Sequence, residues 1–277
     1  MAKIKKFLLG CVICFAGVYV LFCGIVYFMP ELFFYNPYSE RADIETVRRY
    51  GYVGEEVEYK SADGTPLFAW LSRPGNKHKM VVFMHGNSYS VEEFFYKMIP
   101  FEKAGYGTML PEYRGFGGIK GKINQKNLEE DAVAAINYLH HLGYQNKDII
   151  VYGMSLGSHM ATNTVYQLQK EGKFAALVLE VPFDNLTNVV KSVVPFPLPF
   201  SLIVKDKYDN LEMISKIDTR VLIMGGTKDT TVPVRLAENL YNHAAEPKKL
   251  IIYKGGKHSN LFNYRNDKDV LNWLEEK

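Results

Sequence analysis

The fold prediction depends on the stretch Val151-Tyr152-Gly153-Met154-Ser155-Leu156-Gly157. It follows the β-type run Asp148–Ile150 and precedes a helix-type run from Ser158 to Gln169. Its core reads G-x-S-x-G, and between a strand and a helix this pattern is typical of a nucleophile elbow, a sharp turn that exposes one serine. By itself the pattern also fits an ordinary turn, because Gly and Ser are common residues. Whether this stretch is a nucleophile elbow or an ordinary turn therefore depends on whether an acid and a histidine follow at later strand ends.

The rest of the chain alternates between strand-type and helix-type patterns. An Asp63-Gly64 turn between two short β-type runs predicts a hairpin. A helix is expected over Gln125–Leu142, where apolar residues recur on one face. Continuous apolar runs, typical of strands buried on both faces, lie at Met80–Met84, Ala175–Leu179, Val221–Met224 and Leu250–Tyr253. This alternation predicts an α/β fold with a doubly wound, mostly parallel sheet.

One segment departs from that alternation. Asp184–Ile217 interrupts the alternation of strands and helices, and its part Val193–Phe200 contains three prolines, which no helix or strand interior tolerates. We expect an insertion over the strand ends, and we call residues 184–217 the cap. The cap either covers a pocket for an apolar group or packs plainly against the sheet.

The N-terminal region predicts a membrane anchor. Phe7–Phe28 holds 22 residues without a charge, and as a helix it would span roughly 33 Å, enough to cross a bilayer core. Lys3, Lys5 and Lys6 precede it, which favours a cytoplasmic N-terminus and a catalytic domain on the other side, in a periplasm, exterior or lumen. A cleaved signal peptide is the competing interpretation, but its apolar core is shorter and a small-residue cleavage site should follow. A buried core helix is the third possibility.

The predicted division is a cytoplasmic N-terminus at 1–6, a transmembrane signal-anchor at 7–28, a linker at 29–52 and a folded domain at 53–277. All cysteines, Cys11, Cys14 and Cys23, lie in the anchor, so the folded domain has no disulfide or cysteine-metal chemistry. Three of the 33 basic residues precede the anchor, which leaves as many basic as the 30 acidic residues. This balance gives no argument for a nucleic-acid partner.

Distinctive residues stand where predicted strands end, and sites in open α/β sheets gather at that edge. Ser155 comes first, Asp229 follows the strand at 221–224, and His258 follows the last strand. Serine, then acid, then histidine is the order of the α/β-hydrolases. A free hydroxyl is a weak nucleophile, so His258 is predicted to take the proton of Ser155, and Asp229 to hold the imidazole.

Two parts of this site have alternatives. Glu180 or Asp184, after the preceding strand, would also supply the acid. His85 stands at the end of an earlier strand, and we expect its ring to hold the neighbouring loop rather than to react. The backbone N–H groups of Leu156 and Asn87 are predicted to form the oxyanion hole, for which only the amides are required.

Five motifs together resemble the membrane-anchored α/β-hydrolase-domain serine hydrolases, whose relatives include lysophospholipid lipases, protein depalmitoylases and serine aminopeptidase-like enzymes. These motifs are Met84-His85-Gly86-Asn87, Tyr113-Arg114-Gly115-Phe116-Gly117, Gly153–Gly157, Gly226-Thr227-Lys228-Asp229-x-x-Val232-Pro233 and Gly256-Lys257-His258. The resemblance implies the α/β-hydrolase fold, a serine triad and no metal or cofactor. The family usually has Asp at Glu112, often Ser near Ile119, and commonly Gly at Ser158.

The predicted function is hydrolysis of carboxylic esters or thioesters of lipid or other acyl substrates by a membrane-anchored serine esterase. Peptide or amide hydrolysis by the same triad is the alternative reaction. A non-catalytic binding module on the same fold is the alternative of another class.

Overall fold

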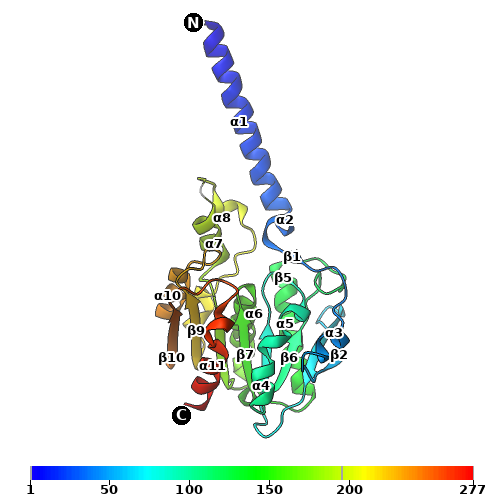
Figure 1. The fold of residues 1–277 in the computed structure, drawn as a ribbon. Helices are drawn as coiled ribbons and strands as arrows, with labels where there is room; N and C mark the ends of the chain where they lie inside the picture. Colours follow the sequence, from blue (N-terminus) through cyan, green and yellow to red (C-terminus); the bar gives the residue numbers. More distant parts are fainter. Residues whose placement is uncertain (1, 195, 277) are drawn as a thin grey trace.

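The computed structural model describes residues 2–194 and 196–276, and a sheet of eight strands runs through the body of the molecule (Figure 1). The order across the sheet is β10-β9-β8-β7-β4-β6-β3-β2. β2 and β3 form the predicted hairpin, β3 is antiparallel to β6, and every other pairing in this sheet is parallel. The strands are β2 (Glu55–Lys60), β3 (Pro66–Ser72), β4 (Met80–Met84), β6 (Gly107–Pro111), β7 (Ile149–Met154), β8 (Ala176–Glu180), β9 (Val221–Gly226) and β10 (Lys248–Tyr253).

Helices cover both faces of the sheet, because the central strands are apolar on both sides. Every residue of β4, β7, β8 and β9 is buried. Side chains of α5 (Gln125–His141), α6 (Leu156–Leu168) and α10 (Val234–His243) belong to the core of one face. Those of α3 (Ile44–Arg48), α4 (Ile99–Lys103) and α11 (Asn266–Glu275) belong to the core of the other. The predicted doubly wound, mostly parallel α/β-hydrolase sheet is confirmed.

The Gly153–Gly157 turn leaves the sheet near its middle, because β7 lies between β4 and β8. Ser155 has φ +54° and ψ −120°, and α6 begins at the next residue. Its N–H donates to the carbonyl of Glu180 at 2.9 Å. A Cβ on Gly153 would lie 2.2 Å from the carbonyl oxygen of Gly157, and one on Gly157 would lie 1.9 Å from that of Met84. A side chain at either position would collide with backbone that cannot move aside, so glycine is required at both.

The described residues of the cap form three helices, α7 (Leu186–Val193), α8 (Phe200–Ile203) and α9 (Leu211–Ile214). Asn185 caps α7 by accepting from the N–H of Asn188 at 2.9 Å. Pro195, also in the predicted cap, lies outside the described residues. α7 and α8 lie at the end of the molecule from which the N-terminal helix projects (Figure 1).

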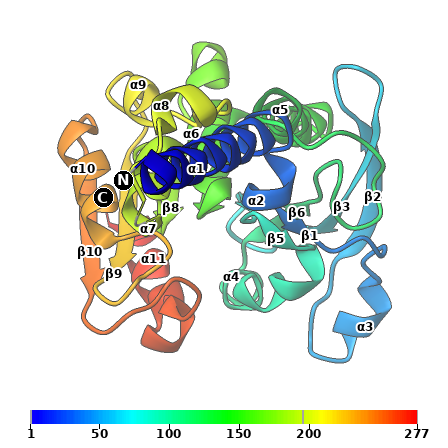
Figure 2. The ribbon, with the colours of Figure 1, turned by 90° about the horizontal axis from the view of Figure 1, so that it is seen from above.

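That helix, α1 (Ala2–Phe28), extends well beyond the body of the molecule (Figure 1). Its span Lys3–Phe28 has a mean hydropathy of 2.5, and only 6% of the most apolar window is buried. A buried core helix is therefore wrong as an interpretation of this segment. By length and composition the helix suits a membrane crossing. Figure 2 shows it nearly end-on, with α7 and α8 beside it.

The predicted linker is more ordered than expected. It holds α2 (Glu31–Phe34), the two-residue strand β1 (Asn36–Pro37) and α3, which Asp43 caps through the N–H of Glu45. β1 pairs in parallel with β5 (Ser88–Tyr89), which directly follows the loop after β4. The chain just beyond α1 is thus hydrogen-bonded to the loop that was predicted to supply an oxyanion donor.

We expect Gly157→Ala to destabilise the full-length protein in detergent. The added methyl group would overlap the Met84 carbonyl, and overpacking of this kind costs roughly 2–3 kcal/mol. Thermal unfolding should show a midpoint lowered by roughly 5–10 °C for a domain of this size. Gly75→Ala is the matched control, since a Cβ there meets its nearest neighbours at 3.6 Å, an ordinary contact. Equal midpoints for the two variants would contradict the close approach at the elbow.

Candidate active site

Ser155, His258 and Asp229 are brought together at the carboxyl edge of the sheet from three separate loops. The hydroxyl of Ser155 lies 2.9 Å from Nε2 of His258, and Nδ1 of His258 lies 2.8 Å from Oδ2 of Asp229. A proton on Nδ1 lets the ring donate to the carboxylate and accept from the serine hydroxyl. The three predicted residues therefore have the connectivity of a serine triad.

The two carboxylate oxygens of Asp229 have different partners. Oδ1 accepts from the backbone N–H groups of Thr231 at 2.9 Å and Val232 at 2.8 Å, which leaves Oδ2 for His258. The side chain of Asp229 is 1% exposed, whereas that of His258 is 20% exposed. A buried, fixed acid thus orients a ring that solvent and small molecules can reach.

Glu180, one of the alternative acids, has other partners. Its oxygens lie 2.8 and 3.1 Å from Nζ of Lys97, and Oε2 accepts from the hydroxyl of Tyr152 at 2.5 Å. Burial and then the nearby Glu180 carboxylate raise the pKa of Tyr152 well above its usual range, so the phenol keeps its proton and donates. Glu180 therefore belongs to a buried ion pair below the site.

Asp184, the other alternative acid, holds the start of the cap. Its carboxylate accepts from the N–H of Asn185 at 2.6 Å, from Nδ2 of Asn188 at 3.0 Å and from Nδ2 of Asn239 at 2.8 Å. These bonds join α7 to α10. Of the three candidate acids, Asp229 is the one whose carboxylate is hydrogen-bonded to His258.

His85 lies in the interior beside the loop after β4. Its Nδ1 is 2.8 Å from the carbonyl of Gly86, and its Nε2 is 2.8 Å from Oε1 of Glu112. Glu112 also accepts from the N–H groups of Val91 and Tyr113. The predicted loop-holding role of His85 fits these contacts. Glu112, which stands where the resembling family usually has Asp, ties three segments of this region together.

Among the described residues, the side chains of His159 and Ser158 form no hydrogen bond with Ser155, Asp229 or His258. The ring of His159 lies 3.0 Å from Oδ1 of Asn210 and 2.8 Å from Oε1 of Glu129. The buried hydroxyl of Ser158 has no partner among the described residues. Within 2–194 and 196–276, no group of three or more His, Cys, Asp or Glu side chains is arranged to hold a metal ion.

The amides predicted to form the oxyanion hole flank Ser155. Leu156 is the first residue of α6, and the loop of Asn87 lies against the nucleophile, since a Cβ on Gly86 would be 3.4 Å from that of Ser155. Neither amide N–H donates to another residue in the described part of the chain. Both are free to donate to a charged oxygen that develops beside Ser155.

The side chain of Asn87, to which the sequence assigned no role, holds this loop to the segment after α1. Its Nδ2 donates to the carbonyl of Phe34 at 2.8 Å, and the backbone carbonyl of Asn87 accepts from the N–H of Asn36 at 2.9 Å. These bonds lie at the start of the β1–β5 pairing. A parallel pairing of two residues has no sequence signature, so the contact was not predictable.

An apolar cavity of about 490 Å³ adjoins the site between α1, α2 and the cap. Three of its lining residues, Asn87, Thr230 and Thr231, are neighbours of the proposed catalytic groups. The remaining lining residues are apolar: Phe22, Val26, Phe33, Phe34, Leu186, Val189, Val190, Val193, Val194, Leu198, Phe200 and Ile203. Such a lining, with a few polar groups at one end, is typical of sites for small apolar ligands.

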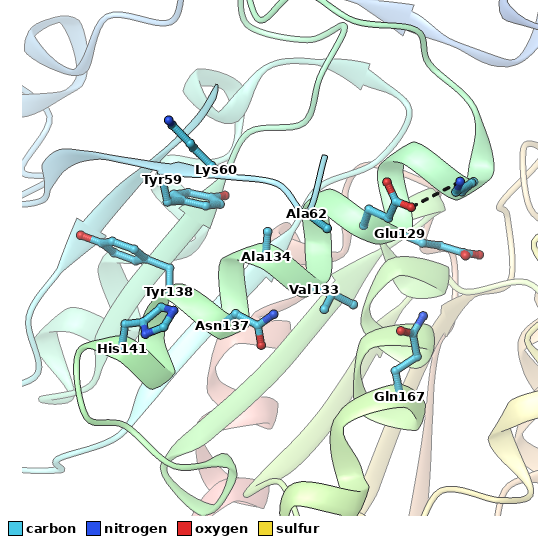
Figure 3. A pocket seen from close by; sticks show the side chains of 12 residues that line it. Tyr59, Lys60, Ala62, Glu129, Val133, Ala134, Asn137, Tyr138, His141 and Gln167 are labelled. Atoms are coloured by element: carbon cyan, nitrogen blue, oxygen red, sulfur yellow. Dashed lines mark ion pairs between the residues drawn. The ribbon is translucent and has the colours of Figure 1, made fainter. Parts of the chain in front are cut away.

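A second hollow, of about 680 Å³, lies over α5 (Figure 3). Side chains of β2, α5 and α6 line it, and the rings of Tyr59 and Tyr138 are stacked in it with centroids 5.4 Å apart. Its lining mixes charged and polar side chains, among them Glu129 and His141. Since it contains none of the triad residues, cavity volume does not locate the active site here.

Comparison with known proteins places these features in a family. The model of the prolyl oligopeptidase family matches residues 92–277, which include Ser155, Asp229 and His258. The chain belongs to the prolyl oligopeptidase family. A protein of Mycobacterium tuberculosis, Rv2307c, is 31% identical over 212 residues, covering 74% of this chain and 73% of its own. The protein YfhR of Escherichia coli is 27% identical over 256 residues, covering 89% and 86%.

Two named enzymes are also similar. Lysophosphatidylserine lipase ABHD12 of Gallus gallus is 28% identical over 220 residues, covering 71% of this chain and 55% of the lipase. The esterase Pf2001 of Pyrococcus furiosus has a TM-score of 0.69 at 21% identity, covering 87% and 98%, and shows the same fold. Together with the family match, these findings confirm that the chain is an esterase- or lipase-like serine hydrolase of the α/β-hydrolase fold.

Replacement of the proposed triad acid should abolish most of the activity. We expect Asp229→Asn to lower kcat for a p-nitrophenyl ester by about 10³–10⁴-fold, because the amide favours the wrong tautomer of His258. Asp184→Asn should retain kcat within about tenfold while the unfolding midpoint falls, since this carboxylate holds α7 and α10. The reverse pattern in steady-state kinetics would assign the acid to Asp184.

The tie between Asn87 and Phe34 should affect catalysis. Asn87→Ala keeps the amide N–H but removes the donor to the Phe34 carbonyl, so the loop is held less firmly. We expect kcat to fall by about 10–10²-fold with KM little changed, as displacement of a catalytic group by about 1 Å can do. Ser88→Ala is the control, since it removes only a hydroxyl contact of 3.3 Å to the Asn87 side chain. Equal kcat for Asn87→Ala and the wild type would show that the tie has no catalytic role.

Proposed function

We propose that this protein is a membrane-anchored serine hydrolase that cleaves carboxylic esters or thioesters of acyl substrates through an acyl-enzyme. One observation carries the proposal: His258 bridges the hydroxyl of Ser155 and the carboxylate of Asp229 with bonds of 2.9 and 2.8 Å. A serine with a positive φ on a strand-to-helix turn, beside two free amides, provides the rest of the acyl-transfer machinery.

In the first step Oγ of Ser155 attacks the substrate carbonyl carbon while its proton passes to Nε2 of His258. The carbonyl oxygen becomes an oxyanion and accepts hydrogen bonds from the amides of Leu156 and Asn87. Asp229, fixed by the Thr231 and Val232 amides, stabilises the imidazolium.

Collapse of this intermediate breaks the bond between the carbonyl carbon and the leaving oxygen or sulfur. His258 gives its proton to the leaving alcohol or thiol, and the acyl group remains esterified to Ser155. A water molecule then attacks the acyl carbon as His258 takes its proton. The second collapse releases a carboxylic acid and returns the proton to Ser155.

Ester chemistry is favoured over amide chemistry by the cavity beside the triad. Its lining consists mainly of apolar side chains and suits an acyl chain better than a polar peptide backbone. The similar enzymes with named reactions are a lysophosphatidylserine lipase and an esterase. The name of the prolyl oligopeptidase family supports the alternative, a peptidase or amidase with the same residues.

The proposed location is a single-pass membrane protein with the hydrolase domain on the non-cytoplasmic side. The support is α1, which is long, apolar and exposed, together with Lys3, Lys5 and Lys6 ahead of the apolar stretch. Exposed large apolar residues cluster around the outer end of α1, among them Phe28, Leu32 and Phe33. Such residues are expected at a membrane–water interface.

A fluorophosphonate probe tests whether Ser155 is a reactive nucleophile. We expect the full-length protein in detergent to be labelled, and Ser155→Ala to be unlabelled with an unchanged unfolding midpoint. Ser192→Ala is the control, because that hydroxyl lies in the cap and donates to the carbonyl of Asn188. A folded wild type without label would favour a non-catalytic binding module.

Parallel assays on p-nitrophenyl esters and aminoacyl p-nitroanilides test the bond type. We expect kcat/KM for esters to exceed that for anilides by at least about 10²-fold, because the oxygen leaving group needs less assistance and the cavity is apolar. Higher kcat/KM on the anilides would establish the peptidase alternative.

A further inference from the structure

The cavity beside the triad has a wall supplied by the anchor itself. Phe22 and Val26 of α1 line it opposite α7 and α8 of the cap. Val26 is 6% exposed and packs with Phe200, Ile203 and Val204 in a small core separate from the two cores of the sheet. The hydroxyl of Tyr19, about two turns before Val26, donates to the carbonyl of Pro197 at 2.9 Å. The anchor and the cap are therefore in direct contact around this cavity.

The polar end of the cavity is the catalytic end. Asn87 provides one of the two proposed oxyanion amides, and Thr231 donates its N–H to Asp229. A substrate whose carbonyl carbon lies at Ser155 would extend its acyl chain away from these residues. The chain would then pass between Phe34 of α2 and Leu186 of α7 toward Phe22 and Val26.

The apolar end of the cavity would lie at the level of the membrane if α1 crosses it. If Lys6 marks the inner boundary of the hydrocarbon, a helix reaches its outer boundary after roughly 20 residues, since about 30 Å is crossed at about 1.5 Å per residue. The twentieth residue after Lys6 is Val26. Phe22 and Val26 thus lie in the outermost turns of the anchor that are still in hydrocarbon.

The cap presents its own apolar side chains at this same end of the molecule. Leu202 is 72% exposed and Phe196 is 68% exposed, and both belong to the region of the cap next to α1. Figures 1 and 2 show α8 beside the base of α1. Exposed apolar side chains around an anchor are stable in the lipid interface and unfavourable in water. With α1 inserted in a bilayer, this end of the cavity would face lipid.

We propose that this cavity is the binding site for the fatty acyl chain of a lipid ester, and that the chain enters sideways from the outer leaflet. Phe22 and Val26 are then specificity-determining residues, and the anchor is part of the substrate site as well as a tether. This inference rests on the proposed function, because it assigns the acyl substrate of the same triad. A volume of about 490 Å³ falls in the range of sites for single small ligands.

The test is the dependence of kcat/KM on chain length for the full-length protein in nanodiscs. p-Nitrophenyl acetate reports on the triad alone, and p-nitrophenyl dodecanoate reports on the triad and the cavity. Loss of folded enzyme lowers both apparent kcat/KM values by the same factor, so their ratio is unaffected by it. For wild type we expect the ratio to be well above one, since each buried methylene contributes up to about fourfold until the cavity is full.

Val26→Trp fills the cavity, and we expect it to lower the dodecanoate-to-acetate ratio by at least tenfold. Phe22→Ala enlarges the cavity, and we expect it to raise the ratio of hexadecanoate to dodecanoate by at least threefold. Leu21→Trp is the control, because Leu21 lies on the same helix, is 64% exposed and does not line the cavity. Its ratios should equal those of wild type.

Wild-type ratios in both Val26→Trp and Phe22→Ala, with acetate still hydrolysed, would overturn the acyl-chain site and leave the proposed function intact. The same ratio change in Leu21→Trp would overturn it too, since the effect would then come from the bilayer. Absence of acetate hydrolysis by folded wild type would overturn the proposed function and this inference with it. If Val26→Trp hydrolyses neither ester, the ratio of hexadecanoate to dodecanoate in Phe22→Ala decides whether the acyl-chain site is kept or rejected.

Discussion

The positive φ of Ser155 is the constraint on which the rest of the structure depends. A non-glycine residue at φ +54° is strained by roughly 1–3 kcal/mol, so the surrounding fold must hold it. The Gly153–Gly157 contact, the Gly157–Met84 contact and the hydrogen bond from the Ser155 amide to Glu180 all act on this one turn. Because β7, β8, β9 and β10 are parallel, the loops after β9 and β10 lie at the same edge of the sheet as this turn and bring Asp229 and His258 to the serine.

A second set of contacts holds the oxyanion loop, partly from the interior and partly from the chain beside the anchor. His85 and Glu112 fix the loop from inside, through bonds of 2.8 Å at the imidazole and two further amides at the carboxylate. Phe34 and Asn36 fix it from outside, through the side chain and the carbonyl of Asn87. The segment that follows α1 is thereby a structural part of the hydrolase domain rather than a passive linker.

Sequence patterns predicted what depends on periodicity and order along the chain. The apolar strands, the hairpin, the elbow and the Ser–Asp–His order all have such signatures, and the structure brings Ser155, Asp229 and His258 within hydrogen-bonding distance. The alternatives to Asp229, which were Glu180 and Asp184, could not be excluded from the sequence, because packing decides which group a carboxylate contacts. Lys97, distant in sequence, neutralises Glu180, and Asn239 binds Asp184. The β1–β5 pairing and the contact of α1 with the cap could not be predicted from the sequence for the same reason.

The place of the cavity suits a lipid ester on energetic grounds. Moving an acyl chain from bilayer to water costs about 0.8 kcal/mol per methylene, or roughly 8–10 kcal/mol for a chain of twelve carbons. A site that opens to water must recover this cost from its own apolar contacts, whereas a site walled by Phe22 and Val26 exchanges one apolar environment for another. The chain beyond the anchor has equal numbers of basic and acidic residues and so has no net charge to hold it at a membrane. In the proposed arrangement α1 supplies both the attachment and the wall, so that long-chain esters already in the leaflet are the favoured substrates of Ser155.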